Sequence, residues 1–161
     1  MNVKLVYLDS SSIVKRYIEE KGSQIVDVVY ERAEASKLRF AFSIWNAGEV
    51  LGVLDRYLSR RLLSENEFKT ALSDFLSESI KMTRLSSLQI LPITTKSLTE
   101  SWLLTLKHHL YVADALQLAA SKEADCNLIL SADDELIQIA RNEGIEAINI
   151  ESQPERALAS L

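Results

Sequence analysis

Four acidic residues stand at or near the starts of separate predicted helices: Asp9, Glu49, Asp114 and Asp133. Two of them, Asp9 and Asp133, come directly after apolar, strand-like runs. Carboxylates that a fold gathers within a few ångströms repel one another and raise one another's pKa, and a cation lets them stay ionised together. Magnesium suits such a site because it takes oxygen ligands and keeps several waters, and manganese would fit the same oxygens. A site of this kind suits hydrolysis of phosphodiester bonds.

Three of these acids also have an ordinary structural explanation. Asp9 could be a helix N-cap, and so could Asp133 or its neighbour Asp134. Glu49 lies in the first turns of its predicted helix, where the helix dipole favours a negative charge. Taken singly, a cap or a solvated glutamate explains each of these residues without any ligand.

Asp114 is harder to explain structurally. It is the only charged residue in an apolar helical stretch from Leu110 to Ala120. An unpaired buried carboxylate is costly, and no lysine or arginine lies within one turn to pair with it. Asp114 is therefore the strongest candidate for a cation ligand.

Other polar residues are candidates for supporting groups or for alternative metal ligands. Ser11 and Ser131 could hold a metal-bound water or orient a carboxylate. His108 and His109 are adjacent, so they point to different sides of a helix end and fit a cap better than a metal site. The single cysteine, Cys126, excludes a disulfide framework and a cysteine zinc site, and is interpreted as a structural thiol.

Strand-like and helix-like segments alternate along the chain. Strands are predicted at residues 3–8, 38–42, 88–93, 127–130 and 145–150. Helices are predicted at residues 10–20, 23–35, 43–61, 64–80, 95–108, 111–122 and 133–142, with a capping box at Ser64 and Glu67 and a C-cap glycine at Gly144. This alternation predicts an α/β fold, with a parallel sheet covered on both faces. Ligands of such sheets bind at the carboxyl ends of the strands, where Asp9 and Asp133 would lie.

Length and charge limit the classes of protein to consider. With 161 residues, of which 47% are hydrophobic, we expect one domain spanning residues 1–161. A net charge of -5 argues against coating nucleic acid through a broad positive field, so any such contact must be local. Arg56, Arg60 and Arg61 could touch phosphates, or could form a solvated helix face with salt bridges. No apolar run is long enough for a membrane span or a signal segment, so we expect a cytoplasmic protein.

Four motifs together resemble the PIN domain, and most closely its VapC-like toxin branch. They are the runs Tyr7–Tyr17, Asn46–Leu51, His109–Ala119 and Ser131–Leu136, which occur in the family's order and approximate spacing. The resemblance covers nearly the whole chain. It implies a three-layer α/β/α sandwich around a parallel sheet of about four to five strands, and a Mg²⁺- or Mn²⁺-dependent endoribonuclease. It also implies frequent homodimers and inhibition by a cognate VapB-like antitoxin.

The resemblance assigns roles to particular residues. The family's acidic, catalytic metal ligands match Asp9, Glu49, Asp114 and Asp133, and Ser11 matches its small polar position two residues after the first acid. The fourth motif is usually Thr-x-Asp, and Ser131-Ala-Asp133 keeps its hydroxyl. This spacing favours Asp133 over Asp134 as the ligand and leaves Asp134 in an outer, supporting position. Glu49 is assigned mainly by resemblance.

Alternative functions remain open. A phosphotransferase with an Asp9 nucleophile usually has Asp-x-Asp, but Ser11 takes the second position here. A receiver domain needs an aspartate after its third strand, and the segment that starts at Leu91 offers none. A PIN-like module could also bind RNA or a protein without cleavage, or act as a nuclease in RNA processing that is not a toxin.

Further expectations concern the binding of macromolecules. We expect single-stranded or loop RNA as the substrate, because bases in an A-form duplex are poorly accessible to side chains. Trp45 and Tyr111 could stack on a base, or could be core or rim aromatics. An antitoxin would insert an apolar helix between the long helices at residues 47–58 and 68–80.

Overall fold

A computed structural model describes residues 3–161, and the first two residues of the predicted domain lie outside it. Five parallel strands form one sheet in the order β3-β2-β1-β4-β5. The strands are β1 (Leu5–Leu8), β2 (Arg39–Ser43), β3 (Leu88–Leu91), β4 (Leu128–Ser131) and β5 (Glu146–Asn149). The prediction of an α/β fold with a parallel sheet of four to five strands is therefore confirmed. The third strand ends before Pro92, which has no N–H to donate to a neighbouring strand.

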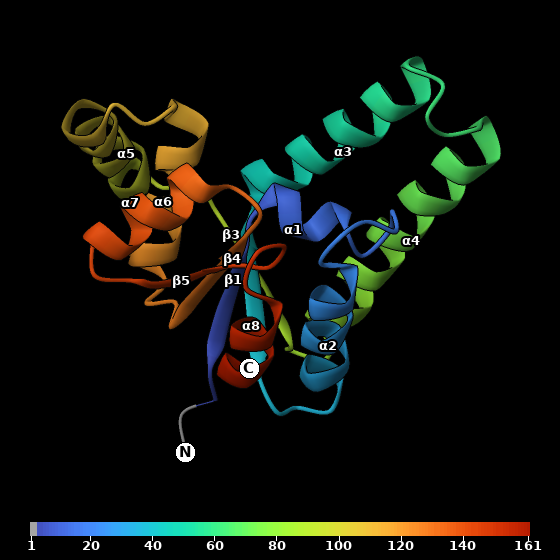
Figure 1. The fold of residues 1–161 in the computed structure, drawn as a ribbon, viewed down its shortest axis with the longest axis horizontal. Coiled ribbons are helices and arrows are strands. Elements are labelled where there is room, and N and C mark those ends of the chain that lie inside the picture. The colour runs from blue at the N-terminus through green and yellow to red at the C-terminus, as the bar shows by residue number, and fades with distance from the viewer. Residues whose placement is uncertain (1–2) are drawn as a thin grey trace.

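Helices cover both faces of this sheet, so the molecule has three layers (Figure 1). One face packs against α1 (Ser10–Val14), α2 (Ser23–Glu34), α3 (Ile44–Ser59), α4 (Glu65–Arg84) and α8 (Pro154–Ser160). The other face packs against α5 (Thr95–His108), α6 (Val112–Glu123) and α7 (Asp134–Asn142). The side chains of β1 show how the sheet serves two cores, because Val6 and Leu8 enter the first core and Tyr7 enters the second.

Two helical segments differ from the sequence prediction. Helix α1 ends at Val14 instead of continuing to residue 20. The buried Lys15 that follows pairs with Glu20 at 3.1 Å and with Glu151 at 2.6 Å. After Val14 the backbone forms turns, in which the N–H groups of Lys15, Arg16 and Tyr17 donate to carbonyls three residues earlier. The contact with Glu151 joins residues 136 positions apart, which local periodicity does not reveal. Helix α8, which starts at Pro154, was not predicted.

The other predicted helices are present, with ends shifted by a few residues. Ser64 and Glu67 form the predicted capping box of α4. Gly144 follows the C-cap of α7 with a φ of +82°, a left-handed conformation that favours glycine. Among the described residues, no helix combines the length and apolarity needed to cross a bilayer.

The strand order reverses at β1, which lies between β2 and β4. The carboxyl ends of β1 and β4 are therefore adjacent, and the Asp9 N–H donates to the Leu130 carbonyl at 3.3 Å. After β2, Ser43 caps α3, which forms with α4 a helical hairpin that extends beyond the sheet (Figure 1). The segments carrying Asp9, Glu49 and Asp133 thus leave the same edge of the sheet.

Candidate active site

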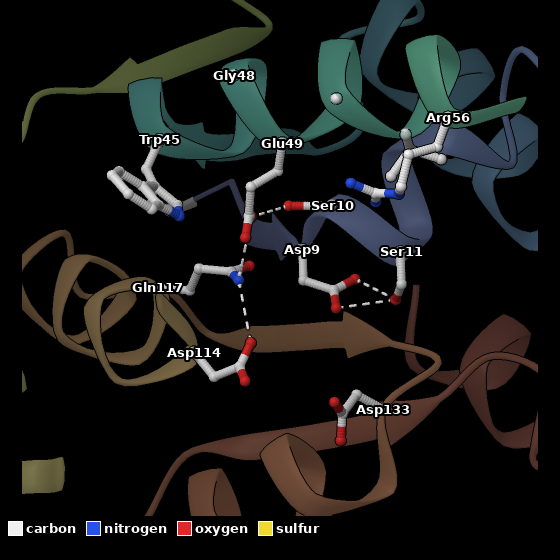
Figure 2. A pocket seen from close by; sticks show the side chains of 12 residues that line it. Asp9, Ser10, Ser11, Trp45, Gly48, Glu49, Arg56, Asp114, Gln117 and Asp133 are labelled. Carbon is white, nitrogen blue, oxygen red and sulfur yellow. Dashed lines mark hydrogen bonds between the residues drawn. The ribbon is translucent and has the colours of Figure 1, made fainter. Parts of the chain in front are cut away.

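A cleft of about 570 Å³ opens at this edge and brings the four predicted acids together. Asp9 follows β1, Glu49 lies on α3, Asp114 lies on α6 and Asp133 follows β4 (Figure 2). The cleft is also lined by Ser10, Ser11, Trp45, Gly48, Gly52, Val53, Arg56 and Gln117. Residues from four distant parts of the sequence therefore share one polar cavity.

Asp9 is both a helix cap and a wall of the cleft. Its Oδ1 accepts a hydrogen bond from the Ser12 N–H at 2.9 Å, which caps α1. The Ser11 hydroxyl lies 2.8 Å from both carboxylate oxygens, and the Ser131 hydroxyl donates to Oδ2 at 2.6 Å. Burial raises the pKa of Asp9, while these donors lower it by favouring the charged form. The capping and site explanations of Asp9 are thus compatible.

The two serines also connect Asp9 to the loop after β4. Ser11 Oγ accepts from the Ala132 N–H at 2.9 Å, and Ser131 Oγ accepts from the Asp133 N–H at 2.9 Å. Both hydroxyls donate to the Asp9 carboxylate, while Ser11 accepts from the opposing loop and Ser131 accepts from the loop that directly follows it. This arrangement fixes the first and fourth acidic segments relative to one another.

Asp133 and Asp134 have different surroundings. Asp133 lines the cleft and caps α7, since its Oδ1 accepts from the Glu135 and Leu136 N–H groups at 2.8 and 3.1 Å. Its Oδ2 accepts no bond from the residues that the structure describes. Asp134 Oδ1 instead accepts from Asn149 Nδ2 at 2.8 Å, beside β5. The geometry thus places Asp133 at the cleft, and its role as a ligand stays a prediction.

A buried amide network connects Glu49 to Asp114. Gln117 Nε2 donates to Glu49 Oε2 at 3.3 Å and to Asp114 Oδ1 at 3.4 Å (Figure 2). The same Glu49 oxygen accepts from Ser10 Oγ and from Asn46 Nδ2. Asn46 Nδ2 also donates to Gln117 Oε1 at 2.6 Å, and both amide side chains are buried. Two acids on different helices are thereby held by one shared donor.

The sequence analysis did not identify Gln117 as a site residue. A signal was nevertheless present, because Gln117 is the one other polar residue in the apolar stretch from Leu110 to Ala120 and lies three positions after Asp114. Residues at that spacing share a helix face. The role of Asn46 depends on β2 and α3 meeting α6, which no local pattern reveals.

Negative charge dominates the electrostatics of the cleft. The pKa of Asp114 is raised to about 6, first by burial and then by the charges of Asp133, Glu49 and Asp9. The cation among the lining residues is Arg56. The acids therefore repel one another in the protein alone, which is the condition that a bound cation relieves.

The oxygens around the cleft fit a hard divalent cation that keeps part of its water shell. Within residues 3–161, no three carboxylate, imidazole or thiol groups are close enough to hold one ion directly. Magnesium needs only one or two carboxylates when water and substrate phosphate fill its other positions. The donor set and the raised pKa of Asp114 are thus compatible with such an ion.

Several other residues weighed in the sequence lie outside the cleft. His108 Nε2 contacts Glu143 at 2.7 Å, and His109 is the C-cap of α5, so neither imidazole lines the cavity. Tyr111 is the N-cap of α6 and is 69% exposed. Arg60 and Arg61 follow the last turn of α3 and are exposed. Of the basic residues at the end of α3, Arg56 is the one at the cleft.

The PIN domain family model matches residues 6–142 of this chain. The match spans all four acids and most of the chain, so the protein belongs to the PIN domain family. The resemblance seen in the sequence motifs is therefore confirmed at the level of the family. No curated protein is similar enough in sequence to match the chain.

Solved structures share the fold at low sequence identity. PAE2754 from Pyrobaculum aerophilum is 19% identical with a TM-score of 0.57, and the similarity covers 99% of each chain. VapBC2 from Rickettsia felis, bound to a promoter DNA fragment, is 12% identical with a TM-score of 0.61, covering 90% of this chain and 98% of that one. VapC20 from Mycobacterium tuberculosis, described as a sarcin-ricin loop cleaving toxin, is 14% identical with a TM-score of 0.60, covering 83% and 93%.

Proposed function

We propose that this PIN-domain protein is a metal-dependent endoribonuclease and the toxin of a VapBC-type toxin-antitoxin pair. The convergence of Asp9, Glu49, Asp114 and Asp133 around one cleft carries the nuclease proposal. Membership of the PIN family and structural similarity to a toxin described as cleaving the sarcin-ricin loop support the same function. We place its action in the cytoplasm, where its RNA substrates are made and used.

In this proposal the four acids would hold Mg²⁺ or Mn²⁺ in the cleft, with no more than two of them bound to one ion directly and the others acting through its water shell. When bound, such an ion supplies an activated water and neutralises charge that develops on the phosphate. The surrounding side chains have positioning roles: Ser11 and Ser131 fix the Asp9 carboxylate, and Gln117 orients the carboxylates of Glu49 and Asp114. Hydrolysis by water would leave a 5′-phosphate and a 3′-hydroxyl.

A cleavage assay on structured RNA with single-stranded loops tests the nuclease activity. Purified wild-type protein should cut the RNA with added Mg²⁺ or Mn²⁺ and stop when EDTA is added. Asp9→Asn and Asp114→Asn should each lose most of the activity. Asp55→Asn is a matched control, because Asp55 is exposed on α3 and does not line the cleft. Undiminished cleavage by both site variants would refute the site, and no cleavage by wild type would favour a binding module.

The antitoxin is proposed to bind along the hairpin of α3 and α4. Apolar side chains on this hairpin are strongly exposed, among them Leu51, Leu76 and Ile80 at 41%, 49% and 54%. An amphipathic helix from a VapB-like partner would cover such side chains by the helix-in-groove mode. Similarity to VapBC2 from Rickettsia felis, whose structure contains both members of such a pair, supports this partner.

The toxin role has its own test. Expression should arrest growth, and co-expression of the adjacent gene product should relieve the arrest. Leu76→Ala combined with Ile80→Ala should weaken antitoxin binding while leaving RNA cleavage intact. Unchanged antitoxin binding would refute the hairpin site, and normal growth with full cleavage in vitro would favour an RNA-processing nuclease that is not a toxin.

We also propose a homodimer formed through α5. One side of this helix exposes large apolar side chains, with Trp102, Leu103 and Leu106 exposed by 53%, 64% and 76%. Contiguous apolar surface of this kind is characteristic of a protein interface. Light scattering should show a dimer for wild type and a monomer for the double variant Leu103→Glu, Leu106→Glu. A wild-type monomer at micromolar concentration would refute this proposal.

A further inference from the structure

Arg56 stands in an acidic cleft, yet its guanidinium pairs with no other side chain in the part of the protein that the structure describes. Within the described residues, no carboxylate lies within 4.0 Å of its guanidinium. Arg16, in contrast, pairs with both Asp27 and Glu78 at 2.7 Å. Figure 2 shows Arg56 reaching from α3 into the cleft toward Ser10 and Ser11. Its planar set of donors is therefore free to bind a ligand in the cleft.

Two glycines precede Arg56 on the same face of α3. A Cβ atom built on Gly52, one turn earlier on α3, would lie 3.6 Å from Arg56 Nη1, so the guanidinium lies directly over that glycine. Gly48, a further turn earlier, also lines the cleft, and a Cβ there would meet nothing within 4 Å. Neither glycine has a positive φ, and glycine inside a helix is less stable than alanine. Folding alone does not account for these two glycines.

The opposite end of this surface carries an aromatic ring. Trp45 lines the cleft and is 42% exposed, although large apolar side chains are favoured in the interior. Trp45, Gly48, Gly52 and Arg56 recur every three to four residues, so they share one face of α3. At a rise of 1.5 Å per residue this face extends about 16 Å. Across the cleft stand Asp114 and Asp133 (Figure 2).

We propose that Arg56 binds a backbone phosphate of the RNA strand next to the bond that is cut, while Trp45 stacks on one of its bases. This inference rests on the proposed nuclease function. Arginine binds phosphate through two parallel hydrogen bonds, and aromatic rings stack on bases of any sequence. The open backbone at Gly48, where a Cβ would meet nothing within 4 Å, lets the sugar-phosphate chain cross α3 closely between the two contacts.

The net charge of -5 makes this local contact important. A protein without a broad positive field gains little from non-specific attraction, so a single well-placed cation has a large share in recognising the strand. The four acids repel phosphate unless a cation offsets their charge. Arg56 provides a positive charge on the wall opposite Asp114 and Asp133.

Binding of RNA, measured apart from cleavage, tests the proposal. The probe is a fluorescein-labelled single-stranded 12-mer RNA, and fluorescence anisotropy is followed in EDTA so that no cleavage occurs. Arg56→Gln should weaken binding about tenfold or more, as expected for loss of a charged hydrogen bond. It should also reduce the slope of log affinity against log salt by about 0.7, the value for one lost phosphate contact on a single strand. Arg56→Lys should restore the salt slope but only part of the affinity.

Matched variants separate the contacts. Arg60→Gln removes an exposed arginine at the end of the same helix that does not line the cleft, and should bind RNA as wild type does. Trp45→Ala should weaken binding without changing the salt slope, and Trp45→Phe should retain most of the affinity. Gly48→Leu should block binding while the melting temperature stays at or above that of wild type, because a Cβ at this position meets nothing within 4 Å and leucine favours a helix more than glycine does.

The outcomes distinguish this inference from the nuclease proposal. If wild type cleaves RNA but Arg56→Gln and Gly48→Leu bind the 12-mer as wild type does, the α3 contact is wrong and the nuclease remains. If wild type cleaves no RNA but these variants lose RNA binding as described, the α3 contact is supported and the nuclease is wrong. In an active enzyme, Arg56→Gln should raise KM more than it lowers kcat. If Arg56→Gln and Arg60→Gln weaken binding of the 12-mer RNA equally, the inference is also overturned.

Discussion

Ser131 on β4 donates a 2.6 Å hydrogen bond to the Asp9 carboxylate at the end of β1, and both side chains are buried. The same hydroxyl accepts the Asp133 N–H at 2.9 Å. One side chain thus sets the orientation of the first acid and the position of the fourth. Because its donation favours the charged carboxylate, it also opposes the rise in the Asp9 pKa that burial causes.

Ser131→Ala should therefore reduce cleavage without removing any acid. We expect kcat/KM to fall about 10- to 100-fold, as is typical when a group that orients a metal ligand is removed. Ser131→Thr keeps the hydroxyl and should retain most of the activity. Cleavage kinetics at several Mg²⁺ concentrations provide the measurement. Full activity and unchanged Mg²⁺ dependence in Ser131→Ala would contradict this role.

Gln117 is expected to matter for both activity and stability. Gln117→Leu preserves the approximate volume but removes the donor shared by Glu49 and Asp114, and leaves Asn46 with one partner fewer. We expect kcat/KM to fall about 10- to 100-fold. Unmet hydrogen bonds should also lower the free energy of unfolding by about 1–2 kcal/mol.

Gln138→Leu on α7 is the matched control, because Gln138 is exposed and bonds only to Asn142 at 3.3 Å among the described residues. It should change neither activity nor stability appreciably. Urea unfolding and RNA cleavage measured on both variants check the contrast. Similar effects at residues 117 and 138 would show that the network contributes nothing specific.

The Asp114 carboxylate is expected to lower the free energy of unfolding at neutral pH, although cleavage requires it. Its folded-state pKa of about 6 lies above the usual value of 3.8, so the folded protein holds its proton more tightly than the unfolded chain. Stability from this group is fully present below about pH 4 and is lost as pH rises through about 6. Asp114→Asn should thus be more stable than metal-free wild type at pH 7, on the order of 1 kcal/mol, while losing cleavage.

Urea unfolding in EDTA between pH 4 and pH 7 measures this effect. The difference in unfolding free energy between Asp114→Asn and wild type should grow across the interval and shrink when Mg²⁺ is added to wild type. Asp55→Asn, on the exposed side of α3, serves as the matched control. A constant difference between Asp114→Asn and wild type at all pH values would count against the raised pKa.

The parts of the fold that follow from local pattern were predictable. The parallel sheet follows from apolar runs alternating with helices, and its carboxyl edge follows from that topology, so Asp9 and Asp133 could be expected on the same side. Asp114 stood out because its helix is otherwise apolar. Glu49 could not be placed by physical pattern, since a glutamate near a helix start looks the same whether it faces a cleft or solvent.

The features of the fold and the site that the sequence alone did not predict depend on contacts between distant segments. Helix α1 ends early where Lys15 reaches Glu151, 136 residues away. The link from Asn46 to Gln117 spans 71 residues. The sequence does not distinguish Arg56 from Arg60 and Arg61. Only the packing of α3 beside the acids places Arg56, and not the other two, at the cleft. Local periodicity identifies faces of helices, and tertiary packing decides which face meets which.

Glu143 stabilises the layer of α5, α6 and α7 and should govern its resistance to acid. Its carboxylate, whose side chain is 9% exposed, pairs with Lys107 at 2.7 Å and with Lys122 at 2.9 Å. Together with a contact to His108, these groups lower its pKa to about 2. For an acid with a lowered pKa, the stabilisation is present above the usual value of 4.5 and is lost as pH falls toward 2. Glu143→Gln should therefore lower the free energy of unfolding by about 1–2 kcal/mol at pH 7 and flatten its acid dependence.

Glu34→Gln is the matched comparison for Glu143→Gln. Glu34 pairs with Lys81 at 2.6 Å, but both side chains are more than half exposed, at 53% and 51%. Exposed pairs contribute only about 0.2–1 kcal/mol, so this variant should remain close to wild type in unfolding measurements from pH 2 to pH 7. Neither carboxylate lines the cleft, so both variants should cleave RNA normally at pH 7. Equal losses of stability in the two variants would show that burial of the Glu143 cluster adds nothing to its ion pairs.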